Sequence, residues 1–180
     1  MNFAQIKSLY RVSEIGIHYK YKVPYKDRIA IDSPSKAYEV LRFTWDQNKI
    51  ELMEQFKILL TDNKSNCLGI VDIASGSMNA CIVDTRLLFS AALKAKASGI
   101  ILTHNHPSGN LIPSEKDKEL TEKIHQGGKI LDIAILDHLI VSPQSYYSFI
   151  ENGIMPDQKQ SNEKAKGINL SPMNPKQLLL

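Results

Sequence analysis

The chain has 180 residues, of which 43% are hydrophobic and 23% charged, and its formal net charge is +3 at pH 7. This composition is that of one soluble globular domain, and so small a positive charge does not by itself indicate a nucleic-acid-binding protein. Two cysteines without metal-ligand spacing argue against a disulfide framework, and no apolar run approaches membrane-spanning length. We therefore expect a cytoplasmic protein with no membrane partner, of undefined oligomeric state.

Residues 1–32 mix helical and extended patterns, and we expect them to form an N-terminal arm. Tyr19, Tyr21 and Tyr25 are interleaved with lysines and an arginine in this segment. Cations beside aromatic rings are typical of nucleic-acid contacts, but lysines are exposed by default in any soluble protein. We therefore favour an extended arm that packs on the domain, and nucleic acid remains a weakly supported alternative partner.

A first helix is predicted to begin after Ser33, which suits an N-cap, and to end before Asp46-Gln47-Asn48. Hydrophobic periodicity predicts five further elements, in the order strand, strand, helix, strand and helix, at residues 51–60, 67–74, 84–97, 100–103 and 114–125. Gly127-Gly128 is expected to stop the last helix. This order of elements predicts a mixed sheet between helices.

Beyond the glycine pair the pattern predicts two more strands, at residues 129–134 and 136–141, and a short closing helix at 146–150. The last segment, residues 154–180, is rich in Lys, Gln, Asn and Ser and nearly free of aromatic residues. Such a composition is typical of a flexible C-terminal tail.

The most informative stretch lies between the buried strand and the helix that follows it. In an extended chain, residues two apart point to the same side, so His104 and His106 can aim both imidazoles at one point while Asn105 turns away. Asp117 stands in the first turn of the helix that begins at Ser114. If that helix start folds over the strand end, two imidazoles and a carboxylate form the ligand set of an open zinc site.

Both halves of this pattern also have ordinary structural meanings. Ser114-x-x-Asp117 is close to the capping box of a helix start, and taken alone this is its commoner meaning. A lone His-x-His in a polar loop is also seldom a ligand pair. The two patterns together, spaced by proline and glycine, favour a metal site. The two roles are compatible, because Ser114 can cap the helix and still face the site.

His104-x-His106-Pro107, followed by Ser114-x-x-Asp117, resembles the JAMM motif of the MPN/JAB metallopeptidases. With Leu136-Asp137-His138-Leu139-Ile140-Val141 downstream, the chain is similar to the bacterial RadC branch of that superfamily. The resemblance implies a three-layer α-β-α sandwich with a mixed sheet, of the cytidine-deaminase-like MPN/JAB type, over residues 33–153. It also implies that His104, His106 and Asp117 bind Zn²⁺ and that Ser114 stabilises the oxyanion.

The family's general base is a glutamate from an upstream strand, and two glutamates compete for this role. Matching to the family's Glu-x-Phe pattern favours Glu54, and Glu51 is the substitute. At period two, Glu54 shares a face with Phe56 and Ile58, where a carboxylate has to be paired, protonated or next to a metal. The alternative is that Glu54 precedes the buried part of the strand and is simply solvated.

The sequence also supports expectations for His125, His138 and Asp137. His125 is expected at the surface, because it lies more than two helical turns beyond Asp117. His138 lies in an apolar strand and is expected to be a hydrogen-bonded core residue rather than a ligand. Asp137 or His138 is a candidate acceptor for the second nitrogen of a metal-bound imidazole.

The sequence therefore predicts a zinc-dependent hydrolase that attacks a peptide or isopeptide bond in a peptide or protein substrate. Two alternatives stay open: a DNA-associated accessory protein of repair or of a mobile element, as the historical label of RadC implies, and a non-catalytic interaction module. RadC proteins usually carry an N-terminal helix-hairpin-helix region. Residues 1–32 contain no such signature, which weakens the DNA-associated alternative.

Overall fold

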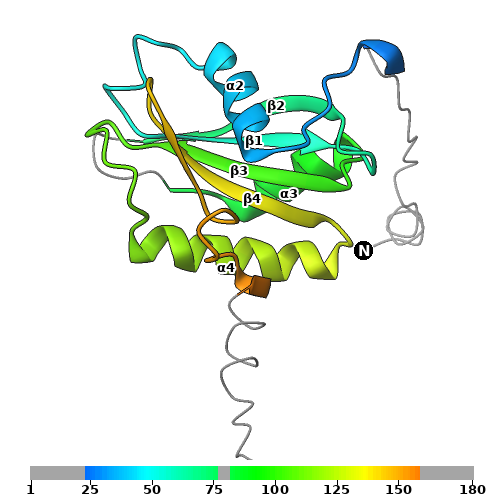
Figure 1. The fold of residues 1–180 in the computed structure, drawn as a ribbon. Coiled ribbons are helices and arrows are strands. Elements are labelled where there is room, and N and C mark those ends of the chain that lie inside the picture. Colours follow the sequence, from blue (N-terminus) through cyan, green and yellow to red (C-terminus); the bar gives the residue numbers. More distant parts are fainter. Residues whose placement is uncertain (1–22, 77–81, 159–180) are drawn as a thin grey trace, which may run out of the picture.

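The computed structural model describes residues 23–76 and 82–158 (Figure 1). Most of the predicted N-terminal arm, the second cysteine Cys81 and most of the predicted C-terminal tail lie outside the described residues. Within the described ranges, no helix combines the length and the apolar character that a membrane crossing requires.

The helical elements are the 3-10 turn η1 (Tyr25–Asp27), α2 (Pro34–Thr44), α3 (Thr85–Lys94) and α4 (Glu115–Ile130). The strands are β1 (Gln55–Thr61), β2 (Cys67–Ser75), β3 (Gly99–Asn105), β4 (Ala134–Val141) and β5 (Tyr146–Ser148). They form one five-stranded sheet in the order β2-β1-β3-β4-β5. Among the described strands, only β3 and β4 pair in parallel, and α4 is the crossover that joins them.

Helices cover both faces of this sheet, with α2 on one side and α3 and α4 on the other (Figure 1). The interior strand β1 is buried along its whole length and divides its side chains between two cores. Phe56, Ile58 and Leu60 join the core beneath α3 and α4, whereas Leu59 joins the core beneath α2. This alternation is the period-two pattern of a strand covered on both faces. The predicted three-layer α-β-α sandwich with a mixed sheet is confirmed.

The prediction that Gly127-Gly128 stops the helix is wrong, because α4 continues to Ile130. Both glycines allow close packing instead. A Cβ atom on Gly128 would lie 2.5 Å from the main-chain oxygen of Ile133, and one on Gly127 would lie 2.6 Å from the ring of Phe89. The predicted strand at residues 129–134 is therefore wrong as well, since its first residues end the helix.

Two other boundaries differ from the prediction. Residues 146–150 do not form a helix, because Tyr146 to Ser148 pair with β4 as the edge strand β5. The first strand begins at Gln55 rather than at Glu51, because residues 46–53 form hydrogen-bonded turns in which the amide of Met53 donates to the carbonyl of Lys49. The short-range pattern of apolar residues does not distinguish such turns from the strand that follows them.

His125 is buried, which corrects the expectation that it lies at the surface. Its Nε2 atom lies 3.1 Å from Oδ1 of Asp157, a residue near the end of the described chain. Lys129 donates to the same carboxylate over 2.9 Å. The end of the described chain thus packs on the last turns of α4. The spacing of His125 from Asp117 could not predict this packing, because it depends on residues much later in the chain.

Candidate metal centre

Three donor groups meet where β3 ends and α4 begins. Ligand atoms of His104, His106 and Asp117 all lie within 4.8 Å of one another. The Nε2 atoms of the two histidines are 2.9 Å apart, and Nε2 of His104 is 3.2 Å from Oδ1 of Asp117. His104 is buried, while His106 and Asp117 are partly exposed, so the cluster is open to solvent on one side.

The pleat of β3 explains the pairing of the two histidines, because residues two apart share a face of the sheet. Asn105 lies between them and points to the opposite face, as predicted. Its amide donates to the carbonyl oxygens of Ile50 over 2.6 Å and of Met53 over 2.9 Å. Its side-chain oxygen accepts the main-chain N–H of Gln55 over 2.8 Å. Asn105 thus fastens the turn that precedes β1 to the strand that carries the histidines.

Asp117 is positioned by a complete capping box at the start of α4. One carboxylate oxygen, Oδ2, accepts both the main-chain N–H and the hydroxyl of Ser114, each over 2.7 Å. The hydroxyl of Ser114 in turn accepts the main-chain N–H of Asp117 over 3.2 Å. The other oxygen, Oδ1, remains directed at His104. Capping and facing the site are therefore simultaneous roles of this serine and aspartate.

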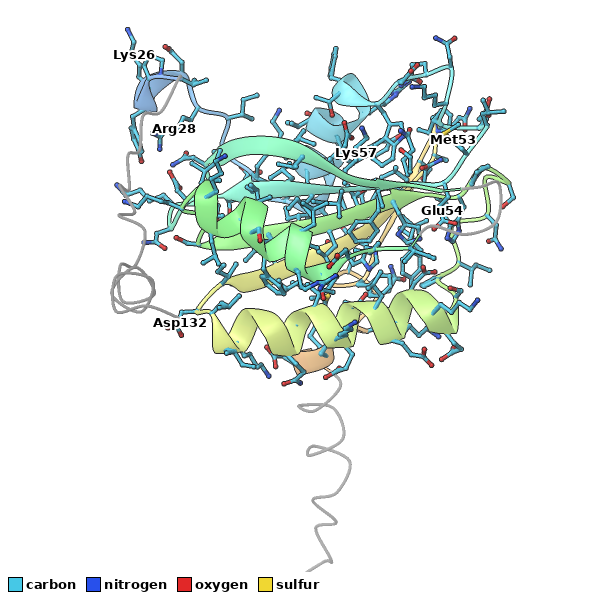
Figure 2. The ribbon with its side chains drawn as sticks, turned by 180° about the vertical axis from the view of Figure 1, so that it is seen from behind. Lys26, Arg28, Met53, Glu54, Lys57 and Asp132 are labelled. Atoms are coloured by element: carbon cyan, nitrogen blue, oxygen red, sulfur yellow. The ribbon has the colours of Figure 1, made fainter. Side chains whose placement is uncertain are left out.

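Glu54 immediately precedes β1 and is half-buried, whereas Glu51 is exposed in the preceding turn. Phe56 pairs with His104 across β1 and β3, so Glu54, two residues earlier, lies on the same face as the histidines. Figure 2 shows Glu54 at the end of the sheet where β1 begins, above the first turns of α4. Burial raises the pKa of the Glu54 carboxyl, and positive charge on His104 and His106 opposes that rise. Glu54 is therefore close enough to the cluster for its pKa to respond to the charges there.

The electrostatics of the cluster favour an ionised aspartate. Burial alone would raise the pKa of Asp117, but its interactions with the imidazoles of His104 and His106 and with the hydroxyl of Ser114 outweigh burial and hold that pKa far below its ordinary value. The neighbouring carboxylate of Asp117 raises the pKa of His106 above its ordinary value. A carboxylate that stays charged beside two imidazoles is suited to binding a cation.

His138 lies behind His104 and is not a member of the three-donor cluster. Its Nε2 atom is 2.8 Å from Nδ1 of His104, and its Nδ1 atom is 2.6 Å from the hydroxyl of Thr121. Complete burial holds the pKa of His138 well below its ordinary value. The sequence-based expectation of a hydrogen-bonded core histidine agrees with this arrangement.

Asp137 faces away from the histidine cluster, so it is not an acceptor for their imidazoles. Its carboxylate accepts the hydroxyl of Ser148 over 2.6 Å and the main-chain N–H of Ile150 over 3.0 Å. It therefore fastens β5 to β4. Sequence reasoning missed Thr121 near the cluster, and it did not reveal the hydrogen bonds that Asn105 makes. For Thr121 a signal was present, because it follows Asp117 by one helical turn and so shares its face of α4.

The donor set is suited to zinc in both chemistry and spacing. Four ligands at about 2.0–2.1 Å from a tetrahedral zinc ion are about 3.3 Å apart. The Nε2 atom of His104 lies 2.9 Å from Nε2 of His106 and 3.2 Å from Oδ1 of Asp117, and Nε2 of His106 lies 3.7 Å from Oδ2 of Asp117. Nδ1 of His106 lies 2.5 Å from the carbonyl oxygen of Asn110 and has to donate to it, because a carbonyl only accepts. In the neutral ring this leaves Nε2 of His106 unprotonated and directed into the cluster.

Comparisons with known proteins agree with this geometry. Residues 31–154 match the family model of the RadC-like JAB domain. A UPF0758 protein of Flavobacterium johnsoniae is 46% identical over 101 residues, covering 56% of this chain and 44% of the relative. A UPF0758 protein of Methanococcoides burtonii is 36% identical over 160 residues, covering 83% of this chain and 70% of the relative.

A third relative, a UPF0758 protein of Trichlorobacter lovleyi, is 37% identical over 123 residues, covering 68% of this chain and 52% of the relative. The chain thus spans about half the length of several curated relatives that it matches. The matched region contains the whole sheet and all three donor residues. On its sequence match and its fold, the chain belongs to the RadC family of the JAB/MPN superfamily, the superfamily of JAMM-type hydrolases.

Proposed function

We propose that this protein is a zinc-dependent hydrolase that cleaves a peptide or isopeptide bond. The observation that carries the proposal is the convergence of two imidazole nitrogens and one carboxylate oxygen on a single point that is open to solvent. Three protein ligands with a fourth position left open are the arrangement of catalytic rather than structural zinc sites.

His104, His106 and Asp117 would hold the metal ion. When bound, zinc would supply Lewis acidity, which makes a water molecule nucleophilic at neutral pH and polarises the substrate carbonyl. Glu54 is placed on the same face of the sheet and is half-buried, with a raised pKa, which suits a general base. It would take a proton from the water and pass it to the leaving amine.

Ser114 would donate a hydrogen bond to the oxyanion that forms as the carbonyl is attacked. Its hydroxyl donates to Oδ2 of Asp117 and is exposed, so a rotation about one bond can redirect it to a substrate. During such a rotation the main-chain N–H of Ser114 keeps its own 2.7 Å hydrogen bond to the same oxygen. Asp117 therefore stays in position while the serine hydroxyl turns to the substrate.

The first test is the metal content of the purified protein, measured by elemental mass spectrometry. We expect about one zinc ion per chain in the wild type and in Glu54→Gln, and little in Asp117→Asn. Absence of zinc from the wild-type protein after incubation with zinc at neutral pH would overturn the proposal.

The second test is hydrolysis, followed by mass spectrometry on a mixed peptide library and on isopeptide-linked peptides. We expect Glu54→Gln to lower the rate about 10²- to 10⁴-fold while zinc is retained, because only the base is lost. The matched control is Glu51→Gln, which changes an exposed glutamate in the same turn and should leave the rate unchanged. Equal activity of Glu54→Gln and Glu51→Gln would refute the assigned base.

A further inference from the structure

The ring of His138 is placed to control the proton on His104, one of the three donors. It is completely buried and packs against the rings of Phe56 and Phe149, with centroid separations of 5.8 and 4.7 Å. A positive charge would be costly between two apolar rings, so the imidazole is neutral. In a neutral imidazole one nitrogen donates and the other accepts. Which nitrogen of His138 donates therefore decides what His104 has to do.

Thr121 determines the donor nitrogen of His138. The hydroxyl oxygen of Thr121 lies 2.6 Å from the main-chain oxygen of Asp117 and 2.6 Å from Nδ1 of His138. Contacts this short each need a proton between the two atoms, and the carbonyl has none to offer. The single hydroxyl proton of Thr121 therefore lies toward Asp117. The proton of the second contact has to come from His138, which donates from Nδ1 and keeps Nε2 as an acceptor.

The same reasoning then determines which nitrogen of His104 carries its proton. Its Nδ1 atom lies 2.8 Å from Nε2 of His138, which is an acceptor, so His104 donates from Nδ1. In the neutral ring of His104 the remaining nitrogen, Nε2, is therefore unprotonated, and it is directed at His106 and Asp117. His106 reaches the same state more directly, since its Nδ1 donates to the carbonyl of Asn110.

We infer that Thr121 and His138 are positioning residues, which form a one-directional hydrogen-bond relay that keeps Nε2 of His104 available to a metal ion. The inference rests on the proposed function only in taking that ion to be zinc. The relay opposes protonation of His104 on Nε2, which is the tautomer that the metal-free cluster would otherwise prefer. With a proton on Nε2, His104 would donate to His106 or Asp117, but its Nδ1 would then face the acceptor nitrogen of His138.

The relay can be read directly in the metal-free protein by two-bond ¹⁵N–¹H correlation spectra of the histidine rings, recorded at mildly alkaline pH. We expect His104 and His138 both to be protonated on Nδ1, with His138→Gln and Thr121→Val used to assign the signals. In Thr121→Val the hydroxyl is replaced by a methyl group of similar size, so His138 loses its acceptor and both rings should shift toward protonation on Nε2. Protonation of His104 on Nε2 in the wild type would overturn the inference.

Zinc affinity, measured by competition with a chromophoric chelator, gives a second readout. We expect Thr121→Val to weaken zinc binding about 10- to 100-fold, as is typical when the hydrogen-bond partner of a metal ligand is removed. Thr121→Ser keeps the hydroxyl and should restore both the tautomers and the affinity. Wild-type affinity in Thr121→Val would overturn the inference, and so would failure of Thr121→Ser to restore it.

These outcomes separate the relay from the proposed hydrolase. The tautomers are read without metal or substrate, so wild-type rings protonated on Nδ1 that shift in Thr121→Val support the relay even if no peptide is cleaved. Zinc-dependent cleavage that is unchanged in Thr121→Val would instead support the hydrolase and refute the relay. If Thr121→Val fails to fold, the wild-type spectrum and the Thr121→Ser variant still decide the question.

Discussion

Replacing Asn105 with alanine should weaken the fold and displace the proposed general base while leaving the metal ligands in place. The side chain of Asn105 makes three hydrogen bonds, to the carbonyls of Ile50 and Met53 and from the amide of Gln55. All three partners are main-chain groups of the turn that leads into β1. Asn105→Ala removes these bonds and leaves the main-chain groups without their partner at a buried position.

The magnitude follows from the three lost hydrogen bonds. At about 0.5–1.5 kcal/mol each, they predict a loss of about 1.5–4.5 kcal/mol in the free energy of unfolding. That is a large share of the about 5–15 kcal/mol by which ordinary domains are stable. Glu54 lies between Met53 and Gln55, and Asn105 holds both of these neighbours. The carboxylate of Glu54 should therefore lose its fixed position, whereas His104 and His106 remain on β3.

Urea denaturation followed by the fluorescence of Trp45, the single tryptophan, measures the stability. The matched control is Asn48→Ala, which removes an exposed asparagine from the same turn and should change stability by less than about 0.5 kcal/mol. Zinc content and hydrolysis are measured on the same samples, and we expect Asn105→Ala to keep zinc and lose most activity. A loss of stability below about 1 kcal/mol, or wild-type activity, would refute the reasoning.

Three other substitutions have outcomes that urea denaturation can check. Gly128→Ala should destabilise the protein by about 1–3 kcal/mol, because its Cβ would meet the main-chain oxygen of Ile133, which cannot move aside. Gly127→Ala should cost clearly less, since its Cβ meets only the partly exposed ring of Phe89; equal effects would contradict this account of the helix end. Ser114→Ala should cost about 1 kcal/mol through loss of the helix cap, and an unchanged midpoint would show that the capping hydrogen bond adds nothing.

Features that depend on neighbouring residues in the chain could be predicted from the sequence. Ser33 caps α2, as predicted, because an N-cap bonds to an amide only three residues away. The convergence of His104 and His106 follows from the pleat of one strand. Asp117 joins them from the first turn of α4, where the capping box with Ser114 fixes its carboxylate.

Features that depend on distant parts of the chain could not be predicted in this way. Gly127 and Gly128 have the composition of a helix end, but their role is decided by Phe89 and Ile133, which pack against them. The strand β5 is short and is defined by its pairing with β4. His138 approaches His104 only because β3 and β4 are parallel neighbours, and no spacing within either strand indicates that pairing.

The start of α4 performs three tasks with residues on one face of the helix. Ser114 caps the helix, Asp117 completes the cap and directs its second oxygen at His104, and Thr121 bonds to the main-chain oxygen of Asp117 one turn later. The positive end of the helix dipole stabilises the carboxylate in this first turn. The metal-binding carboxylate and the far end of the Thr121–His138 relay are therefore held by the same turn of helix. A substitution that frays this turn, such as Ser114→Ala, should loosen both together, whereas Thr121→Val should affect His138 and His104 and leave Asp117 in its cap.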